Sequence, residues 1–240
     1  MAKRTWQVSG KTDIGQKRAN NQDSILVNAE LGLFAVADGM GGHSGGEVAS
    51  SMAIKTLEHA FTTHDGTLET PNLLERAIIE CNKTIYEQSQ KNPQLRGMGT
   101  TLTAAYIEGD ILHIGQVGDS RLYFYRDQNI YQLTEDHSQV YELLKAGLIT
   151  ENSMESFQKN IITRSVGYER DVRVDLFQRP INKGDRYLLC SDGLSGMVSD
   201  EQIAQILHNF DIDTSVRNLV TLANAQGGED NVSVIAFEIK

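Results

Sequence analysis

Apolar and polar residues alternate, or form short apolar runs, in eight segments of the chain, and this pattern predicts β-strands. Short polar turns such as Glu108-Gly109-Asp110 and the one at residues 126–129 join several of these segments directly, which favours antiparallel pairing. The predicted strands span residues 6–11, 24–28, 33–37, 101–107, 111–117, 121–125, 186–190 and 232–239.

Apolar residues recur at helical spacing in five further segments, residues 47–59, 72–91, 138–146, 200–209 and 214–225. Because helices are inserted between clustered strands, we expect an α+β fold whose antiparallel sheets carry helices on their outer faces. A loop-rich stretch, residues 147–171, interrupts this order and is the best candidate for a mobile surface segment. No Pro/Ser/Gly-rich linker divides the sequence, so we interpret residues 1–240 as one domain.

The composition, with 40% hydrophobic and 22% charged residues, is that of an ordinary globular protein. Two cysteines, Cys81 and Cys190, provide neither a disulfide framework nor a cysteine zinc site. The formal net charge of −10 disfavours nucleic-acid binding, so we expect no nucleic-acid partner. No apolar run approaches the roughly 18–20 residues that span a bilayer, and residues 1–6 lack the apolar stretch of a signal peptide. We therefore expect a cytoplasmic protein with no membrane partner.

Four aspartates lie at predicted strand edges beside glycine or a turn: Asp38, Asp119, Asp192 and Asp230. Each could be a simple turn residue, since Asp-Gly is common in hairpin turns. The segments of Asp38 and Asp192, however, run from an apolar strand through Asp-Gly towards a helix, unlike a tight hairpin. Carboxylate oxygens without a His/Cys cluster suit Mg²⁺ or Mn²⁺ better than zinc. A cluster of cations is predicted if these strand ends meet.

Further motifs stand with these aspartates in a definite order. They are Thr12-Asp13-Ile14-Gly15 with Arg18 and Asn21-Gln22-Asp23, Asp38-Gly39-Met40-Gly41-Gly42-His43, Gly97-Met98-Gly99-Thr100-Thr101, Gly118-Asp119-Ser120-Arg121, Asp136-His137-Ser138, Ser191-Asp192-Gly193-Leu194 and Asp230-Asn231-Val232. The series, which spans nearly the whole chain, resembles the metal-dependent protein phosphatases of protein phosphatase 2C type (the PPM family), especially their compact bacterial members. That resemblance implies a four-layer α/β/β/α sandwich, two antiparallel β-sheets flanked by helices, with a flap near residues 147–171.

Carried over by position, the resemblance implies a centre for two or three Mn²⁺ or Mg²⁺ ions. Asp38 would bridge two ions, Gly39 would offer its carbonyl to one, and Asp192 and Asp230 would complete the other. Asp119, with Asp192, would match a third-metal site. These are the residues we expect to bind metal.

The resemblance also implies the residues of catalysis. Asp23 would hold metal-bound water, Arg18 would grip the substrate phosphate and His43 would act as general acid. From the sequence alone, without the resemblance, Arg18 is better interpreted as a solvated surface arginine, and we interpret His137 as structural. Ser156-Phe157 stands where many bacterial members carry His-Pro, a departure within the flap.

The function so implied is hydrolysis of phosphoserine and phosphothreonine in proteins by attack of a water that bridges two ions. Phosphorylated proteins would be substrates, and a eukaryotic-type serine/threonine kinase and its targets would be partners by family analogy. The alternative is a catalytically silent member of the same fold that acts as a binding or regulatory module. Such a relative would most readily lose Asp38, Asp192 or Asp230, and all three are present.

Overall fold

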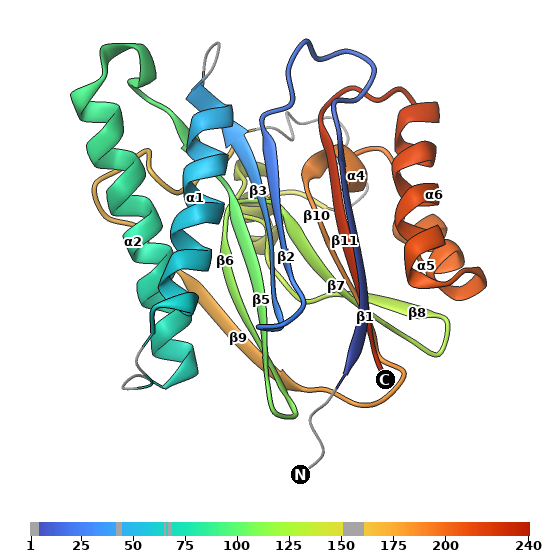
Figure 1. The fold of residues 1–240 in the computed structure, drawn as a ribbon. Helices are drawn as coiled ribbons and strands as arrows, with labels where there is room; N and C mark the ends of the chain where they lie inside the picture. Colours follow the sequence, from blue (N-terminus) through green and yellow to red (C-terminus); the bar gives the residue numbers. More distant parts are fainter. Residues whose placement is uncertain (1–4, 42–44, 65, 67–68, 151–160) are drawn as a thin grey trace.

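Two antiparallel β-sheets lie face to face in the computed structural model, which describes residues 5–41, 45–64, 66, 69–150 and 161–240 (Figure 1). One sheet has the order β1-β11-β10-β7-β8, with bounds Trp6–Asp13, Val232–Ile239, Arg186–Cys190, Arg121–Arg126 and Asn129–Gln132. The other has the order β2-β3-β5-β6-β9, with bounds Asp23–Asn28, Leu33–Met40, Leu102–Glu108, Ile111–Val117 and Asp175–Pro180. The short strand β4 (Gly99–Thr100) pairs with the end of β3.

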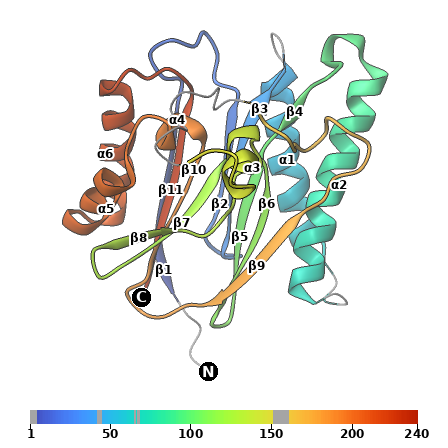
Figure 2. The same ribbon diagram turned by 180° about the vertical axis from the view of Figure 1, so that it is seen from behind.

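Helices cover the outer face of each sheet, as Figures 1 and 2 show from opposite sides. The sheet that contains β3 is covered by α1 (Gly45–Thr62) and α2 (Thr70–Lys91). The sheet that contains β11 is covered by α5 (Asp200–Asn209) and α6 (Ile212–Ala225). Shorter helices are η1 (Pro93–Leu95), α3 (Gln139–Lys145) and α4 (Asp192–Ser195). The four-layer α+β fold predicted from the sequence is confirmed.

Three buried apolar clusters hold these layers together, one between the sheets and one under each helical layer. In the central cluster, the rings of Phe34 and Tyr187 lie 4.8 Å and 5.0 Å from the ring of Phe237 between their centroids. Burying one such side chain contributes about 1.5–3 kcal/mol. The short apolar runs of the central strands therefore have a direct cause, because each sheet buries both of its faces against apolar neighbours.

The structure contains three strands, the two-residue β4 and the longer β8 and β9, that the hydrophobic pattern did not predict. Strand β8 has only four residues and follows β7 through a turn in which Asp127 and Gln128 have φ values of 50° and 65°. These positive values are typical of a type I′ hairpin turn. Strand β9 lies at a sheet edge and alternates between half-buried and exposed residues, so it lacks a continuous apolar run. Its pairing with β6, rather than its own composition, makes it a strand.

The loop between β1 and β2, the end of β3 and the helix α4 lie together at one end of the sandwich (Figure 1). Several predicted site residues belong to these segments. Among the described helices, none has the length and apolar character needed to cross a membrane.

Candidate functional site

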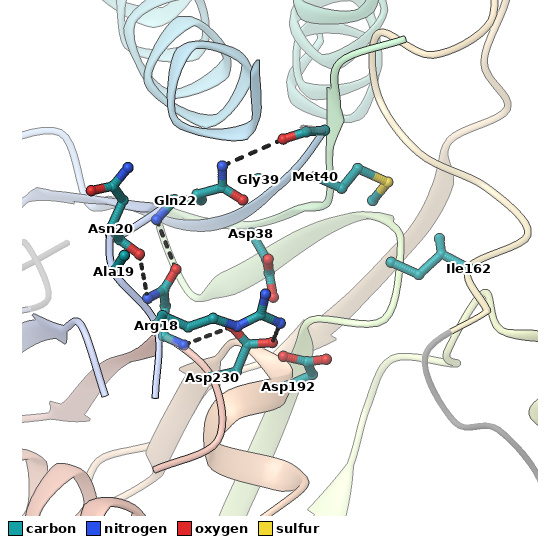
Figure 3. Close-up of a pocket in the computed structure, with 12 residues that line it drawn as sticks. Arg18, Ala19, Asn20, Gln22, Asp38, Gly39, Met40, Ile162, Asp192 and Asp230 are labelled. Carbon is teal, nitrogen blue, oxygen red and sulfur yellow. Dashed lines mark hydrogen bonds and ion pairs between the residues drawn. The ribbon is translucent and has the colours of Figure 1, made fainter. Parts of the chain in front are cut away.

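A cavity of about 610 Å³ opens at this end of the sandwich. Residues from both sheets line it: Arg18, Ala19, Asn20, Gln22, Asp38, Gly39, Met40, Gly41, Ile162, Asp192, Asp230 and Asn231. Figure 3 shows the carboxylates of Asp38, Asp192 and Asp230 grouped beside the guanidinium of Arg18. The structure thus brings together five residues predicted from the sequence, since Gly39 belongs to the same wall.

Asp23 and Asp38 lie directly opposite each other on the neighbouring strands β2 and β3. The backbone N–H of Asp38 donates to Oγ1 of Thr101 at 2.9 Å, and its carbonyl accepts from the N–H of Thr101 at 2.8 Å. Oδ2 of Asp23 accepts a hydrogen bond from the hydroxyl of Ser191 at 2.7 Å, which ties β2 to the end of β10. Both carboxylates are therefore held on rigid strands.

The glycines that follow Asp38 and Asp192 permit close backbone approach rather than hairpin turns. A Cβ at Gly193 would collide with the backbone oxygen of Asn231, and a Cβ at Gly39 would collide with that of Gly46. Only glycine fits where two backbones pass at such a distance. The Asp-Gly dipeptides thus let the ends of β10 and β11, and of β3 and α1, meet at the cavity.

The carboxylates are crowded and short of hydrogen-bond donors. Within the described residues, the buried oxygens Oδ1 of Asp23, Asp119 and Asp192 have no hydrogen-bond partner. Burial, followed by the charges of neighbouring aspartates, raises the pKa of Asp23 and of Asp119 to about 7 each. Burial, followed by the charge of Asp23, also raises the pKa of Asp38 well above its usual range. A buried carboxylate without a partner destabilises the folded protein, and a bound cation would offset this destabilisation.

The donor set fits hard divalent cations such as Mg²⁺ and Mn²⁺, since it consists of carboxylate oxygens and backbone carbonyls. In the part of the chain that the structure describes, no three His, Cys, Asp or Glu side chains are already arranged round one point as ligands of one ion. Water and substrate oxygens commonly complete the coordination of Mg²⁺. The residues present therefore fit such ions as partial ligand sets.

Two predicted residues lie outside the cavity wall that the described residues form. Asp23 and Asp119 are each 7% exposed and do not line the cavity. The charge of Asp192 acts on both of them, so they belong to the same carboxylate group. The predicted general acid His43 and the flap residues Ser156-Phe157 lie outside the described residues.

Sequence reasoning gave no role to Asn231, which connects the segments round the cavity. Its Oδ1 accepts from the backbone N–H of Gln22 at 2.7 Å, and its Nδ2 donates to the carbonyls of Ile14 and Asn20 at 2.9 Å and 3.0 Å. Asn231 thereby fixes the loop that carries Arg18 to the start of β11. The only sequence signal was its place directly after Asp230.

Known proteins resemble the chain over nearly its whole length. The family described as Protein phosphatase 2C matches residues 11–231. The serine/threonine phosphatase stp of Listeria monocytogenes is 41% identical over 236 residues, which cover 95% of this chain and 94% of that protein. The crystal structure of the Mycobacterium tuberculosis serine/threonine phosphatase PstP/Ppp superposes with a TM-score of 0.91 at 39% identity, covering 97% of this chain and 98% of that chain.

A second solved structure, the catalytic domain of PstP in complex with two manganese ions, superposes with a TM-score of 0.90 at 39% identity. It covers 98% of this chain and 99% of that chain. Sequence and architecture thus agree over the same residues that build the carboxylate cavity. The chain belongs to the protein phosphatase 2C family.

Proposed function

We propose that this phosphatase removes phosphate from serine and threonine residues of proteins in a reaction that requires Mn²⁺ or Mg²⁺. The observation that carries the proposal is a single cavity in which Arg18 stands beside Asp38, Asp192 and Asp230. A guanidinium suits a phosphate, and grouped carboxylates suit divalent cations. The names of the Listeria and Mycobacterium relatives, and the manganese ions of the PstP structure, support the same activity.

The metal ligands of the proposal are those the sequence predicted. Asp38 would bridge two ions, Gly39 would give its carbonyl to one, and Asp192 and Asp230 would hold the other. Asp119 would join Asp192 at a third ion. Support comes from the shared cavity for the first four and from the unpartnered buried oxygens of Asp119 and Asp192.

Divalent cations bound at these carboxylates would supply a water of lowered pKa and would offset negative charge on the phosphate. Arg18 would bind and orient the phosphate through charge-assisted hydrogen bonds. The buried carboxylate of Asp23, held by Ser191, would orient that water from the neighbouring strand. Geometry of this kind lowers the barrier mainly by positioning and electrostatic stabilisation.

A cysteine nucleophile does not fit the fold. Cys81 and Cys190 are both fully buried, and burial raises the pKa of Cys190 to about 12 and that of Cys81 as well. A catalytic cysteine needs an accessible, low-pKa thiolate. The proposal therefore needs no phosphoenzyme.

The role of His43 stays a prediction from the sequence. A general acid matters most when the leaving group is basic, so His43→Ala should slow phosphoserine-peptide hydrolysis more than that of p-nitrophenyl phosphate. Single-turnover rates, with metal content checked, make this comparison. Equal slowing of both substrates would remove the general-acid assignment.

The proposed partners are phosphorylated proteins and, by family analogy, a eukaryotic-type serine/threonine kinase. This phosphatase would remove the phosphate that such a kinase adds to its targets. The decisive experiment measures phosphate release from peptides that carry phosphoserine, phosphothreonine or phosphotyrosine, with Mn²⁺, with Mg²⁺ or with EDTA. We expect metal-dependent release from the first two at higher kcat/KM than from the third. Full activity after exhaustive chelation would overturn metal dependence, and no hydrolysis with either metal would favour the silent binding module.

A further inference from the structure

His137 forms hydrogen bonds to both backbone groups of Gly118, the residue before Asp119. The backbone N–H of His137 donates to the carbonyl of Gly118 at 3.0 Å, and the N–H of Gly118 donates to Nδ1 of His137 at 2.9 Å. The His137 side chain is buried, with 6% of the residue exposed. It does not cap the following helix, because Ser138 does so by accepting from the N–H of Tyr141. Two hydrogen bonds of His137 thus hold the β6–β7 turn.

The hydrogen bonds define the tautomer of this histidine. A backbone N–H can only donate, so Nδ1 is an acceptor and the proton of the neutral ring resides on Nε2. Nε2 then donates to Oδ2 of Asp175 at 3.3 Å. Nη1 of Arg164 lies 3.0 Å from Nε2, but it also can only donate. Its acceptors are Oδ1 of Asp175 at 2.7 Å and the carbonyl of Arg173 at 3.3 Å. Asp175 therefore holds the ring with Nδ1 towards Gly118.

Gly118 depends on this external support. Its φ is +104°, a value that favours glycine, and a Cβ there would lie 2.6 Å from the side chain of Thr101. Beyond His137, the Gly118 carbonyl accepts one further hydrogen bond from the described residues, from Nε2 of Gln116 at 2.8 Å. Because Asp119 follows directly, the direction of its carboxylate depends on how the Gly118 peptide is oriented.

The carboxylate of Asp119 has few hydrogen bonds of its own that would hold it in one orientation. Its buried Oδ1 has no hydrogen-bond partner in the described part of the chain. The next residue, Ser120, is firmly held, since its carbonyl accepts from Gln116 at 2.9 Å and its hydroxyl lies 2.7 Å from that of Thr101. Asp119 is therefore aimed by its two neighbours, and Gly118 is the neighbour that His137 controls.

We infer that His137 is a positioning residue that, through Gly118, aims the carboxylate of Asp119 at the cation proposed to lie between Asp119 and Asp192. The inference rests on the proposed function only for the identity of that cation. Residues that orient a ligand from behind commonly change metal affinity by about 10–100-fold when they are replaced. An apolar residue could fill the space of the ring, but only an acceptor at the position of Nδ1 can receive the N–H of Gly118.

The test compares His137→Ala, His137→Asn and His137→Gln. The amide oxygen of asparagine lies close to the position of Nδ1, whereas the amide of glutamine reaches the position of Nε2. Mn²⁺ is titrated by calorimetry into each metal-stripped protein, and thermal unfolding is recorded alongside. The ion weakened by Asp119→Ala should also bind about 10–100-fold more weakly to His137→Ala, near normally to His137→Asn and weakly to His137→Gln. Ions that Asp119→Ala leaves unchanged should bind normally throughout.

A double-mutant cycle separates positioning from general destabilisation. In the background of Asp119→Ala, the change His137→Ala should cause no further loss of Mn²⁺ affinity, because the carboxylate it aims is gone. Additive losses, equal affinities of the asparagine and glutamine variants, or no ion that depends on Asp119 would each overturn the inference. If His137→Ala does not fold, the comparison of Mn²⁺ affinity between His137→Asn and His137→Gln tests the inference without it. Absence of wild-type phosphopeptide hydrolysis would instead defeat the proposed function, because the Mn²⁺ titrations do not depend on turnover.

Discussion

Nη2 of Arg18 lies 2.6 Å from Oδ2 of Asp230, although 212 residues separate them in the sequence. This ion pair joins the residue proposed to bind phosphate to a residue proposed to bind metal. Oδ1 of Asp230 accepts from the N–H of Asn231 at 2.8 Å, so that carboxylate already has two donors. A cation that binds Asp230 would compete with Arg18 and would free the guanidinium for the phosphate.

The first prediction concerns Arg18→Ala. Loss of a hydrogen bond between charged groups should raise KM for a phosphoserine peptide by about 10–100-fold, with a smaller change in kcat. Mn²⁺ affinity should stay the same or increase, since Asp230 loses a competing partner. The matched control is Arg217→Ala, which breaks an exposed ion pair with Asp213 on α6. An unchanged KM, or lost Mn²⁺ binding, would show that the role of Arg18 is different.

The second prediction is that Asp192→Asn lowers turnover by about a thousandfold or more, because it removes a proposed metal ligand. The same change should stabilise the metal-free protein, since Oδ1 of Asp192 is buried without a partner in the described structure. A gain of about 1 kcal/mol would raise Tm by about 2–4 °C for a chain of this size. Calorimetry of the metal-stripped proteins measures this, with Asp213→Asn as an exposed control. Near-normal turnover or a lowered Tm would contradict the assignment.

Metal removal gives the third prediction. A ligand present at 100 times its dissociation constant stabilises the folded state by about 2.7 kcal/mol, so saturating Mn²⁺ should raise Tm by about 5–10 °C over the EDTA-treated protein. The same comparison on Asp38→Asn should give a smaller increase, since Asp38 is the proposed bridging ligand. Equal Tm values with Mn²⁺ and with EDTA in the unmutated protein would argue against the carboxylate cavity as a metal centre.

Two glycines with positive φ provide the fourth prediction. Gly118 and Gly97 have φ values of +104° and +76°, but a Cβ at Gly118 meets Thr101 at 2.6 Å whereas one at Gly97 meets no described atom within 4 Å. Backbone strain of about 1–2 kcal/mol should affect both alanine variants, and the clash should add to it only at Gly118. Urea unfolding of Gly118→Ala and Gly97→Ala measures the difference. Equal losses of stability would show that the turn adapts to a side chain.

The fifth prediction is a pH dependence set by His137. Burial, followed by the charge of Arg164, lowers the pKa of His137, while Asp175 and Asp136 act in the opposite direction. Arg173 also faces this group, 3.7 Å from Asp175. Between the lowered pKa of the folded state and about 6.5 in the unfolded chain, the unfolded state binds more protons. The contribution of His137 to the stability of the metal-free protein should therefore fall as pH drops below about 6.5, in opposition to the buried carboxylates, whose raised pKa values act the other way.

Urea unfolding of the metal-free protein at pH 7.5, 6.5 and 5.5 measures that slope. His137→Asn keeps the acceptor for Gly118 and cannot titrate, so its stability relative to the unmutated protein should increase as pH falls over the same interval. Parallel profiles for the two proteins would exclude His137 as the source. The acidic groups of the cavity are present in both proteins, so they do not affect the comparison.

Local sequence rules predicted the elements with strong patterns. Strand β6 and helix α5 have the predicted bounds, because a short, largely apolar segment directly after the Glu108-Gly109-Asp110 turn and a capped amphipathic segment need no distant partner to be recognised. The glycines after Asp38 and Asp192 were correctly separated from hairpin turns. Strand β9 could not be found in this way. Its residues alternate between half-buried and exposed without an apolar run, and its pairing with β6 is a tertiary contact that no local pattern predicts.

By itself, the sequence determined the layers of the fold and the places where carboxylates follow strands, because period, glycine content and turn chemistry act over a few residues. Tertiary structure alone decided which of those side chains are neighbours. It set Asp23 opposite Asp38, paired Arg18 with Asp230 and turned His137 towards Gly118. These relationships depend on how buried faces pack and how strands register, and such contacts join residues that no local pattern connects.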